Sequence, residues 1–182
     1  MGVCLHEDLE RVLISEEELA QRVSELGAEI SRDYAGKELV IVGVLKGSFV
    51  FMADLMRRIT VPCTADFLAV SSYAMGAQTT GDVKVIKDLD MPVENRHVLI
   101  IEDILDSGVT LSYIMNLMAG KKIASVRLCA LLDKPERRRM PVTPNYRGFS
   151  IPDEFVVGYG LDYAERFRYL PYVAVISKKA IR

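Results

Sequence analysis

The chain has 182 residues, half of them apolar, and its 23 Lys and Arg residues against 25 Asp and Glu residues leave a net charge of −2. This apolar content with low net charge excludes a disordered chain, and the balanced charge argues against bulk electrostatic binding to nucleic acid or anionic membranes. The length suits one domain with its own core. The longest apolar run, Leu39–Leu45, is far shorter than the roughly 20 residues that cross a bilayer.

The N-terminal segment and the cysteines bear on the cellular compartment. Met1–Asp8 has no basic start and no long apolar stretch, so we expect no export signal. The three cysteines, Cys4, Cys63 and Cys129, are widely separated and show no paired spacing, which fits a reducing environment. The sequence therefore predicts a cytoplasmic protein.

The first predicted elements are a helix, a strand and a second helix. A capping box, Ser15 with Glu18 three residues later, opens the first helix, whose apolar residues recur at helical spacing until Gly36. An apolar strand is predicted at Leu39–Val44, and a helical stretch follows to about Arg58. The remaining predicted elements are strands at Cys63–Val70, Val83–Lys87 and His97–Ile101, a helix at Val109–Met118, and strands at Ser125–Leu132, Phe155–Tyr159 and Tyr172–Ile176.

The strands favour a parallel sheet. They are apolar on both faces and separated by helices, which indicates an α/β fold with helices on both sides of the sheet. Ligands bind beyond the carboxyl ends of the strands in such sheets. We therefore expect the site in the turns that follow residues 45, 70, 101, 132 and 160, each of which carries unusual polar residues.

The segment His97–Leu111 carries the most information. Its apolar strand reaches Glu102 and Asp103 and then the turn Asp106-Ser107-Gly108-Val109-Thr110, where a helix begins. Backbone N–H groups at a helix N-terminus, two hydroxyls and a glycine suit a phosphate, and the two acids suit sugar hydroxyls or a shared Mg²⁺. Taken alone, Asp106 or Ser107 can also be a simple N-cap and the acids a solvated loop. That reading does not explain the whole run.

This run resembles the 5-phosphoribosyl-1-diphosphate (PRPP) binding motif of the type I phosphoribosyltransferases. Nearly the whole chain resembles the bacterial hypoxanthine(-guanine) phosphoribosyltransferase family. Competing phosphate motifs fail, because no Gly-x-x-x-x-Gly-Lys-[Ser/Thr] occurs and Gly158-Tyr159-Gly160 lacks the third glycine of a dinucleotide fingerprint. The resemblance implies the type I fold, a central and mainly parallel sheet flanked by helices. It also implies a single domain over residues 1–182, with a small hood formed by the N- and C-terminal segments.

The implied reaction belongs to purine salvage. It joins hypoxanthine or guanine through N9 to the ribose C1 of PRPP, giving IMP or GMP and releasing pyrophosphate with Mg²⁺ assistance. By similarity Asp106 is the general base near the purine N7, and Glu102 and Asp103 hold the ribose hydroxyls and Mg²⁺. The residues implied to bind the ribose phosphate are Glu102, Asp103, Asp106, Ser107, Gly108, Val109 and Thr110. Val109 stands where many relatives carry a polar or basic residue.

Two further segments resemble the family's pyrophosphate site and lid. Lys46 and Gly47, after a peptide between Leu45 and Lys46 that is expected to be cis, match the pyrophosphate loop, and Arg168 is implied to reach the same group. Residues 71–82, with Ser72 and Tyr73, resemble a lid that shields the reacting centre from water. Ala74 stands where relatives often have glycine.

The purine contacts are also implied by the resemblance. Lys134 is implied to donate a hydrogen bond to the 6-oxo group, which would reject adenine. Phe155 is implied to stack on the base, Val156 to contact its edge through the backbone, and Asp162 to lie near the base and hold a second Mg²⁺. On their own, Lys134 suits a solvated loop, and Phe155 and Val156 suit the core. We expect Arg137-Arg138-Arg139 to form an exposed face or an oligomer contact without chemistry.

Two alternatives to this enzyme remain at this stage. One is a regulator that senses PRPP and binds RNA or a protein, against which the net charge of −2 and the intact Asp106 argue. The other is an enzyme for adenine or xanthine, and Lys134 with Phe155 favours an oxopurine. The expected partners are PRPP and a 6-oxopurine, without nucleic acid or membrane, and the resemblance implies a homodimer or homotetramer. The ranking of hypoxanthine, guanine and xanthine stays open.

Overall fold

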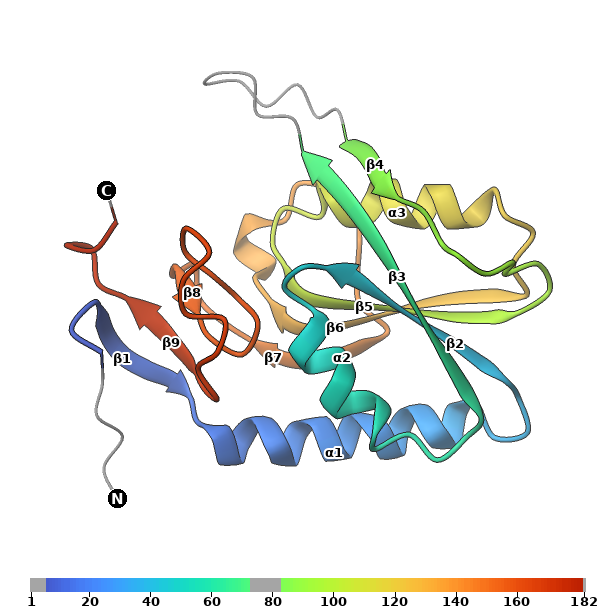
Figure 1. Ribbon diagram of the computed structural model, residues 1–182, viewed down its shortest axis with the longest axis horizontal. Helices are drawn as coiled ribbons and strands as arrows, with labels where there is room; N and C mark the ends of the chain where they lie inside the picture. Colours follow the sequence, from blue (N-terminus) through green and yellow to red (C-terminus); the bar gives the residue numbers. More distant parts are fainter. Residues whose placement is uncertain (1–5, 73–82, 182) are drawn as a thin grey trace.

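A computed structural model describes residues 6–72 and 83–181 (Figure 1). At Ser72 it describes the backbone only. Tyr73, Ala74 and most of the predicted lid lie outside the described residues. The elements in chain order are β1 (Leu9–Ile14), α1 (Glu16–Asp33), β2 (Leu39–Leu45), α2 (Phe49–Met56), β3 (Cys63–Ser72), β4 (Val83–Lys87), β5 (His97–Leu105), α3 (Val109–Ala119), β6 (Ser125–Asp133), a 3₁₀ turn (Pro135–Arg137), β7 (Tyr146–Ser150), β8 (Val156–Val157) and β9 (Val173–Ile176).

A six-stranded sheet in the order β4-β3-β2-β5-β6-β7 forms the centre of the molecule. All neighbouring strands are parallel except β4, which pairs antiparallel with β3. Alternate residues of β2 enter opposite clusters. Leu39 and Ile41 pack with α1 and α2, whereas Val40 and Val42 pack with α3. The predicted parallel sheet with helices on both faces is therefore confirmed.

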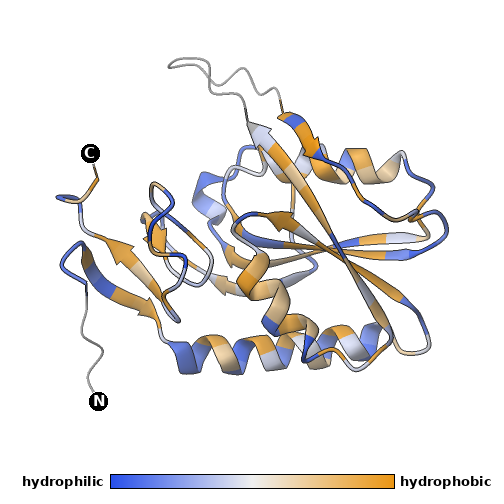
Figure 2. Ribbon diagram, in the orientation of Figure 1, coloured by the Kyte–Doolittle hydropathy of each residue, from blue (hydrophilic) through white to orange (hydrophobic). Residues whose placement is uncertain are grey.

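The capping box that opens α1 is present as predicted. The Ser15 hydroxyl accepts a hydrogen bond from the Glu18 backbone N–H, and the Glu18 carboxylate accepts one from the Ser15 N–H, at 3.2 and 2.8 Å. Hydrophilic and hydrophobic residues alternate along this helix (Figure 2), and its apolar side lies in the core. The helix buries Leu19, Val23, Leu26, Gly27 and Ile30.

A second, antiparallel sheet in the order β1-β9-β8 brings the N- and C-terminal parts of the chain side by side (Figure 1). The sequence patterns predict neither β1 nor β7. The strand predicted at Phe155–Tyr159 is shorter, because Gly158 and Tyr159 take positive φ angles of 98° and 50° and turn the chain after β8. Among the described residues no helix has the length and apolar character to span a membrane.

Candidate active site

The two acids after Ile101 belong to β5, which continues to Leu105, beyond the predicted end of the strand at Ile101. The ladder with β6 continues to Leu105, which pairs with Asp133. Because successive strand residues point to opposite faces, Glu102 and Asp103 enter two different cavities. Glu102 lines a small cavity and Asp103 lines a large one.

The small cavity has a volume of about 70 Å³ and is formed by the turn at the start of α3. Gly108, with φ of +82°, lets the chain pass from the end of β5 into the helix. Its lack of a side chain lets Arg138 lie close behind the turn, because a Cβ atom there would come within 3.1 Å of the Arg138 Cδ. Of the residues predicted to bind the ribose phosphate, this cavity gathers Glu102, Asp106, Ser107, Gly108 and Thr110. Val109 is the first residue of α3.

The large cavity, of about 580 Å³, contains the residues predicted for the purine. Lys134 is only 6% exposed and donates a 2.6 Å hydrogen bond to the Glu154 carbonyl, and its burial lowers the pKa of its ammonium group. Phe155 is 47% exposed and presents its ring at the cavity. The lining residues are Asp103, Ile104, Asp106, Lys134, Arg137, Asp153, Phe155, Val156, Leu161 and Asp162. Asp106 therefore borders both cavities.

The two acids of β5 carry unusual electrostatics. Burial, with a smaller contribution from the Asp103 charge, raises the pKa of Glu102 well above its ordinary value. Burial likewise raises the pKa of Asp103 to about 6, although backbone N–H groups and Arg168 act in the opposite direction. One Glu102 carboxylate oxygen is buried without a hydrogen-bond partner in the described part of the chain. A cation near these acids would remove that electrostatic cost.

The donor set fits a divalent cation that is shared with a ligand. Within residues 6–72 and 83–181, no group of three or more His, Cys, Asp or Glu side chains is arranged to hold a metal ion. Mg²⁺ is commonly bound through one or two carboxylates together with substrate oxygens and water, so each acid could hold an ion together with oxygens of a ligand in its own cavity. Asp162 is already engaged, because its carboxylate pairs with Arg168 at 2.8 Å and accepts the Glu165 N–H at 2.8 Å.

The loop after β2 lies against the acids of β5. The peptide between Leu45 and Lys46 is cis, as the resemblance implied. A Cβ atom at Gly47 would overlap the Asp103 carboxylate, and one at Gly160 would overlap the Gly47 carbonyl, so both positions require glycine. The Lys46 ammonium pairs with Glu165 at 3.1 Å.

Arg168 links the predicted pyrophosphate and metal residues. It donates to the Gly160 carbonyl at 2.8 Å, and its guanidinium lies 3.3 Å from Glu165 in addition to its pair with Asp162. Its buried Nε has no hydrogen-bond partner among the described residues. The segment after β8 and the loop after β2 thus meet at one edge of the large cavity.

The expectation that Arg137-Arg138-Arg139 forms an exposed face agrees with Arg137 and Arg139 but is wrong for Arg138, whose side chain is 18% exposed. Arg137 Nε lies 2.9 Å from the Asp106 carboxylate, and its Nη1 lies 3.2 Å from Asp153. The Arg138 guanidinium turns inward onto backbone carbonyls of the turn. The sequence does not predict these contacts of Arg137 and Arg138, because a run of three arginines is typical of a solvated surface.

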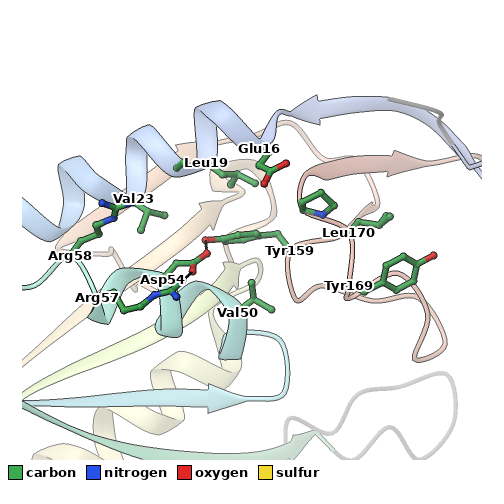
Figure 3. A pocket seen from close by; sticks show the side chains of 12 residues that line it. Glu16, Leu19, Val23, Val50, Asp54, Arg57, Arg58, Tyr159, Tyr169 and Leu170 are labelled. Carbon is green, nitrogen blue, oxygen red and sulfur yellow. Dashed lines mark hydrogen bonds and ion pairs between the residues drawn. The ribbon is translucent and has the colours of Figure 1, made fainter. Parts of the chain in front are cut away.

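A third cavity, of about 480 Å³, lies between α1, α2 and the segment 159–171 (Figure 3). Tyr159 points into it and donates a 2.6 Å hydrogen bond to Asp54, which also pairs with Arg57. Among the residues that the structure describes, none of those predicted for the site lines this cavity.

Comparison with known proteins agrees with this arrangement. The phosphoribosyl transferase domain family matches residues 13–164. The chain belongs to that family. It is 51% identical over 173 residues to the hypoxanthine-guanine phosphoribosyltransferase of Staphylococcus aureus, covering 95% of this chain and 97% of that protein. It is 52% identical to the bifunctional protein TilS/HprT of Listeria innocua, but spans only 27% of the length of that relative.

Solved structures of family members have the same fold. A hypoxanthine phosphoribosyltransferase from Staphylococcus aureus superposes with a TM-score of 0.95 at 48% identity, covering 100% of this chain and 99% of that one. A hypoxanthine phosphoribosyltransferase from Trypanosoma cruzi superposes with a TM-score of 0.92 at 38% identity, covering 97% of this chain and all of that one. The small and large cavities therefore belong to a phosphoribosyltransferase fold.

Proposed function

We propose that this protein is a hypoxanthine-guanine phosphoribosyltransferase of purine salvage. It converts hypoxanthine or guanine and PRPP into IMP or GMP and pyrophosphate. One observation carries the proposal: Asp106 borders both the phosphate-sized cavity and the cavity that holds Lys134 and Phe155. A group at that boundary can reach a base and a ribose phosphate that bind on its two sides.

The small cavity and the large cavity bind different parts of the substrates. Backbone N–H groups of the turn 106–110 with the hydroxyls of Ser107 and Thr110 bind the 5′-phosphate at the N-terminus of α3. Asp106 accepts the proton that the purine loses at N7. Because the transition state resembles an oxocarbenium ion, holding the ribose in line with base and leaving group supplies much of the catalysis.

Lys134 determines the class of base. Its ammonium is buried and has only donors, so it pairs with a 6-oxo acceptor. One N–H of the ammonium already donates to the Glu154 carbonyl. Adenine presents an amino donor at the position of the 6-oxo group and would leave another N–H of this buried ammonium without an acceptor, which disfavours adenine strongly. Phe155 stacks on the base, and the Val156 backbone contacts its edge.

The carboxylates support the use of Mg²⁺. Glu102 and Asp103 would hold the ribose hydroxyls and the ion, and Asp162 would hold a second ion through the oxygen that also accepts the Glu165 N–H. When bound, the ion supplies positive charge that stabilises the departing pyrophosphate. Lys46, Gly47 and Arg168 bind that pyrophosphate.

The proposal extends to the arrangement of the whole chain. Residues 1–182 form one domain, the sheet β1-β9-β8 lies as a hood beside the site, and residues 71–82, with Ser72 and Tyr73, close over the bound substrates. The protein acts in the cytoplasm on small molecules as a homodimer or homotetramer. It binds neither nucleic acid nor membranes.

The proposal is tested by measuring pyrophosphate release with PRPP, Mg²⁺ and one purine base at a time. We expect turnover with hypoxanthine or guanine and a kcat/KM at least ~10³-fold lower with adenine, because an unpaired buried polar group typically produces discrimination of this order or more. Equal turnover with adenine would overturn the assignment of Lys134. No turnover with any oxopurine would overturn the function.

A further inference from the structure

The three consecutive arginines after the 3₁₀ turn have different environments. Arg139 is exposed, and Arg137 lies at the large cavity. Arg138 has a side chain that is only 18% exposed, and its guanidinium lies beneath the turn that forms the small cavity. The function proposed above uses no group of Arg138.

Arg138 binds four acceptors at once. Its Nε donates to the Asp106 carbonyl at 3.0 Å, and its Nη2 donates to the Leu105 carbonyl at 3.4 Å. It also donates to the Val142 carbonyl and pairs with the carboxylate of Asp133. Asp133 is 1% exposed and is fixed from the other side by Arg147 at 2.8 Å. A planar guanidinium held at several acceptors has little freedom to move.

These contacts help to determine where the amides of the turn point, together with the Lys134 backbone N–H, which donates to the Leu105 carbonyl at 3.0 Å. In a planar trans peptide the N–H points opposite to the carbonyl. Since the carbonyls of Leu105 and Asp106 face Arg138, the N–H groups of Asp106 and Ser107 face away from it. The Ser107 carbonyl accepts hydrogen bonds from the backbone N–H groups of Arg139 and Met140, at 2.9 and 3.1 Å, so the next N–H along the chain, that of Gly108, also faces away.

The opposite side of the turn is the small cavity. Over residues 6–72 and 83–181, the structure records no protein acceptor for the N–H groups of Asp106, Ser107 and Gly108. Consecutive unpaired amides on one side of a turn form a concave anion site. Three amides thus face the cavity because three carbonyls are held on the reverse side.

We propose that Arg138, anchored by Asp133, is a positioning residue that aims the Asp106 and Ser107 amides at the phosphate of PRPP, beside the Gly108 amide, which the backbone of residues 139 and 140 positions. This role rests on the proposed function, since it concerns the same phosphate site. Arg138 touches no substrate and acts only through the backbone of the turn. A side chain that holds this backbone affects PRPP more than the purine, whose contacts lie on the other side of Asp106.

The matched substitutions are Arg138→Lys and Arg139→Lys. Lysine at 138 keeps a positive charge beside Asp133. A single ammonium group cannot, however, reproduce the planar guanidinium, which donates to the Leu105 and Asp106 carbonyls and to the Asp133 carboxylate at the same time. The Arg139 side chain is exposed and has no recorded partner within the described part of the chain, and only its backbone holds the turn. Losing charge-assisted hydrogen bonds of this kind reduces the affinity for a ligand by ~10-fold or more.

The experiment measures KM for PRPP and for hypoxanthine, the Kd of PRPP with Mg²⁺ by calorimetry, and Tm. We expect Arg138→Lys to raise the KM and Kd of PRPP by ~10-fold with KM for hypoxanthine within twofold of wild type, and Arg139→Lys to match wild type. A loss of folded protein would lower kcat and leave KM unchanged. An unchanged KM for PRPP in Arg138→Lys overturns the proposal, whatever its Tm.

If Arg138→Lys does not fold, Asp133→Asn provides the test, because it keeps Arg138 and every backbone group but weakens the anchor. We expect KM for PRPP to rise by ~3-fold, the equivalent of one weakened hydrogen bond, and an unchanged value overturns the proposal. If wild-type protein neither binds nor turns over PRPP, the proposed function itself fails. If wild type binds PRPP and Arg138→Lys binds it equally, only the positioning role fails.

Discussion

At the scale of single residues, the Asp106 carboxylate offers the most direct test of catalysis. We expect Asp106→Asn to lower kcat by about 10²- to 10⁴-fold, the range for removal of a general base. Binding of PRPP should change little, because the backbone of the turn remains. The measurement is the steady-state rate of pyrophosphate release together with the calorimetric Kd of PRPP.

Asp153→Asn is the matched control for this substitution. Asp153 lines the same cavity and contacts the same Arg137 guanidinium, at 3.2 Å, but lies outside the phosphate turn. Its replacement should leave kcat within about threefold of wild type, as expected for a half-exposed ion pair. Wild-type turnover in Asp106→Asn would contradict the role of this carboxylate as the base.

Asp103 gives a prediction about pH and stability. Its pKa of about 6 in the folded protein lies roughly two units above its ordinary value of 3.8, which corresponds to a cost of about 3 kcal/mol when the group is ionised. The folded chain therefore binds more protons than the unfolded chain between pH 3.8 and 6. The cost is complete above pH 6 and disappears below pH 4. Asp103→Asn should raise Tm at pH 7.5 by ~6–12 °C, and by much less at pH 4.

Asp33→Asn serves as a control of opposite sign. Hydrogen bonds from Tyr146 and Arg127 lower the pKa of Asp33, so its ionised form stabilises the fold at neutral pH. Its replacement should lower Tm at pH 7.5.

The Asp103→Asn protein should also lose activity. The carboxylate whose burial destabilises the folded chain is one of those proposed to hold Mg²⁺. A lower Tm at pH 7.5 in Asp103→Asn would contradict the assigned burial cost.

At the scale of elements, the sequence predicts what local patterns determine. The apolar run of β2 and the Ser15–Glu18 capping box of α1 have strong local signals, and both are observed. β1 and β7 were missed for a physical reason. β1 has adjacent exposed residues, Glu10 and Arg11, in place of strict alternation, and β7 contains Gly148, where a Cβ would overlap the Leu131 carbonyl of β6. Pairing with distant partners stabilises such strands.

The candidate site likewise contains some residues that a local pattern predicts and others that it does not. The turn 106–110 could be predicted as a phosphate site from its residues, because hydroxyls, glycine and a helix start are adjacent in the chain. Lys134 and Phe155 required the family resemblance, since a lysine or phenylalanine alone has no distinguishing pattern. The inward direction of Arg138 depends on acceptors at Leu105, Asp106 and Val142, and no local pattern separates it from Arg139.

At the scale of the whole molecule, the two sheets share one core. The large apolar cluster contains Ile41 and Leu99 of the central sheet together with Ile14, Val173 and Val175 of the small sheet. The site uses both parts, because Asp106 and Lys134 follow strands of the central sheet and Val156 lies in the small sheet. A continuous core of this kind predicts that the two sheets unfold together.

We therefore expect a single cooperative thermal transition, with calorimetric and van't Hoff enthalpies in agreement, and an upward shift of the whole transition with PRPP and Mg²⁺. Ligand at 100 times its Kd adds about 2.7 kcal/mol, or ~5–10 °C for a chain of this size. Differential scanning calorimetry measures both quantities, and Val173→Ala is the matched variant. Truncating a buried side chain of the small sheet should lower the one transition without splitting it. Two transitions, only one of which responds to PRPP and Mg²⁺, would show instead that the small sheet folds independently of the substrate-binding core.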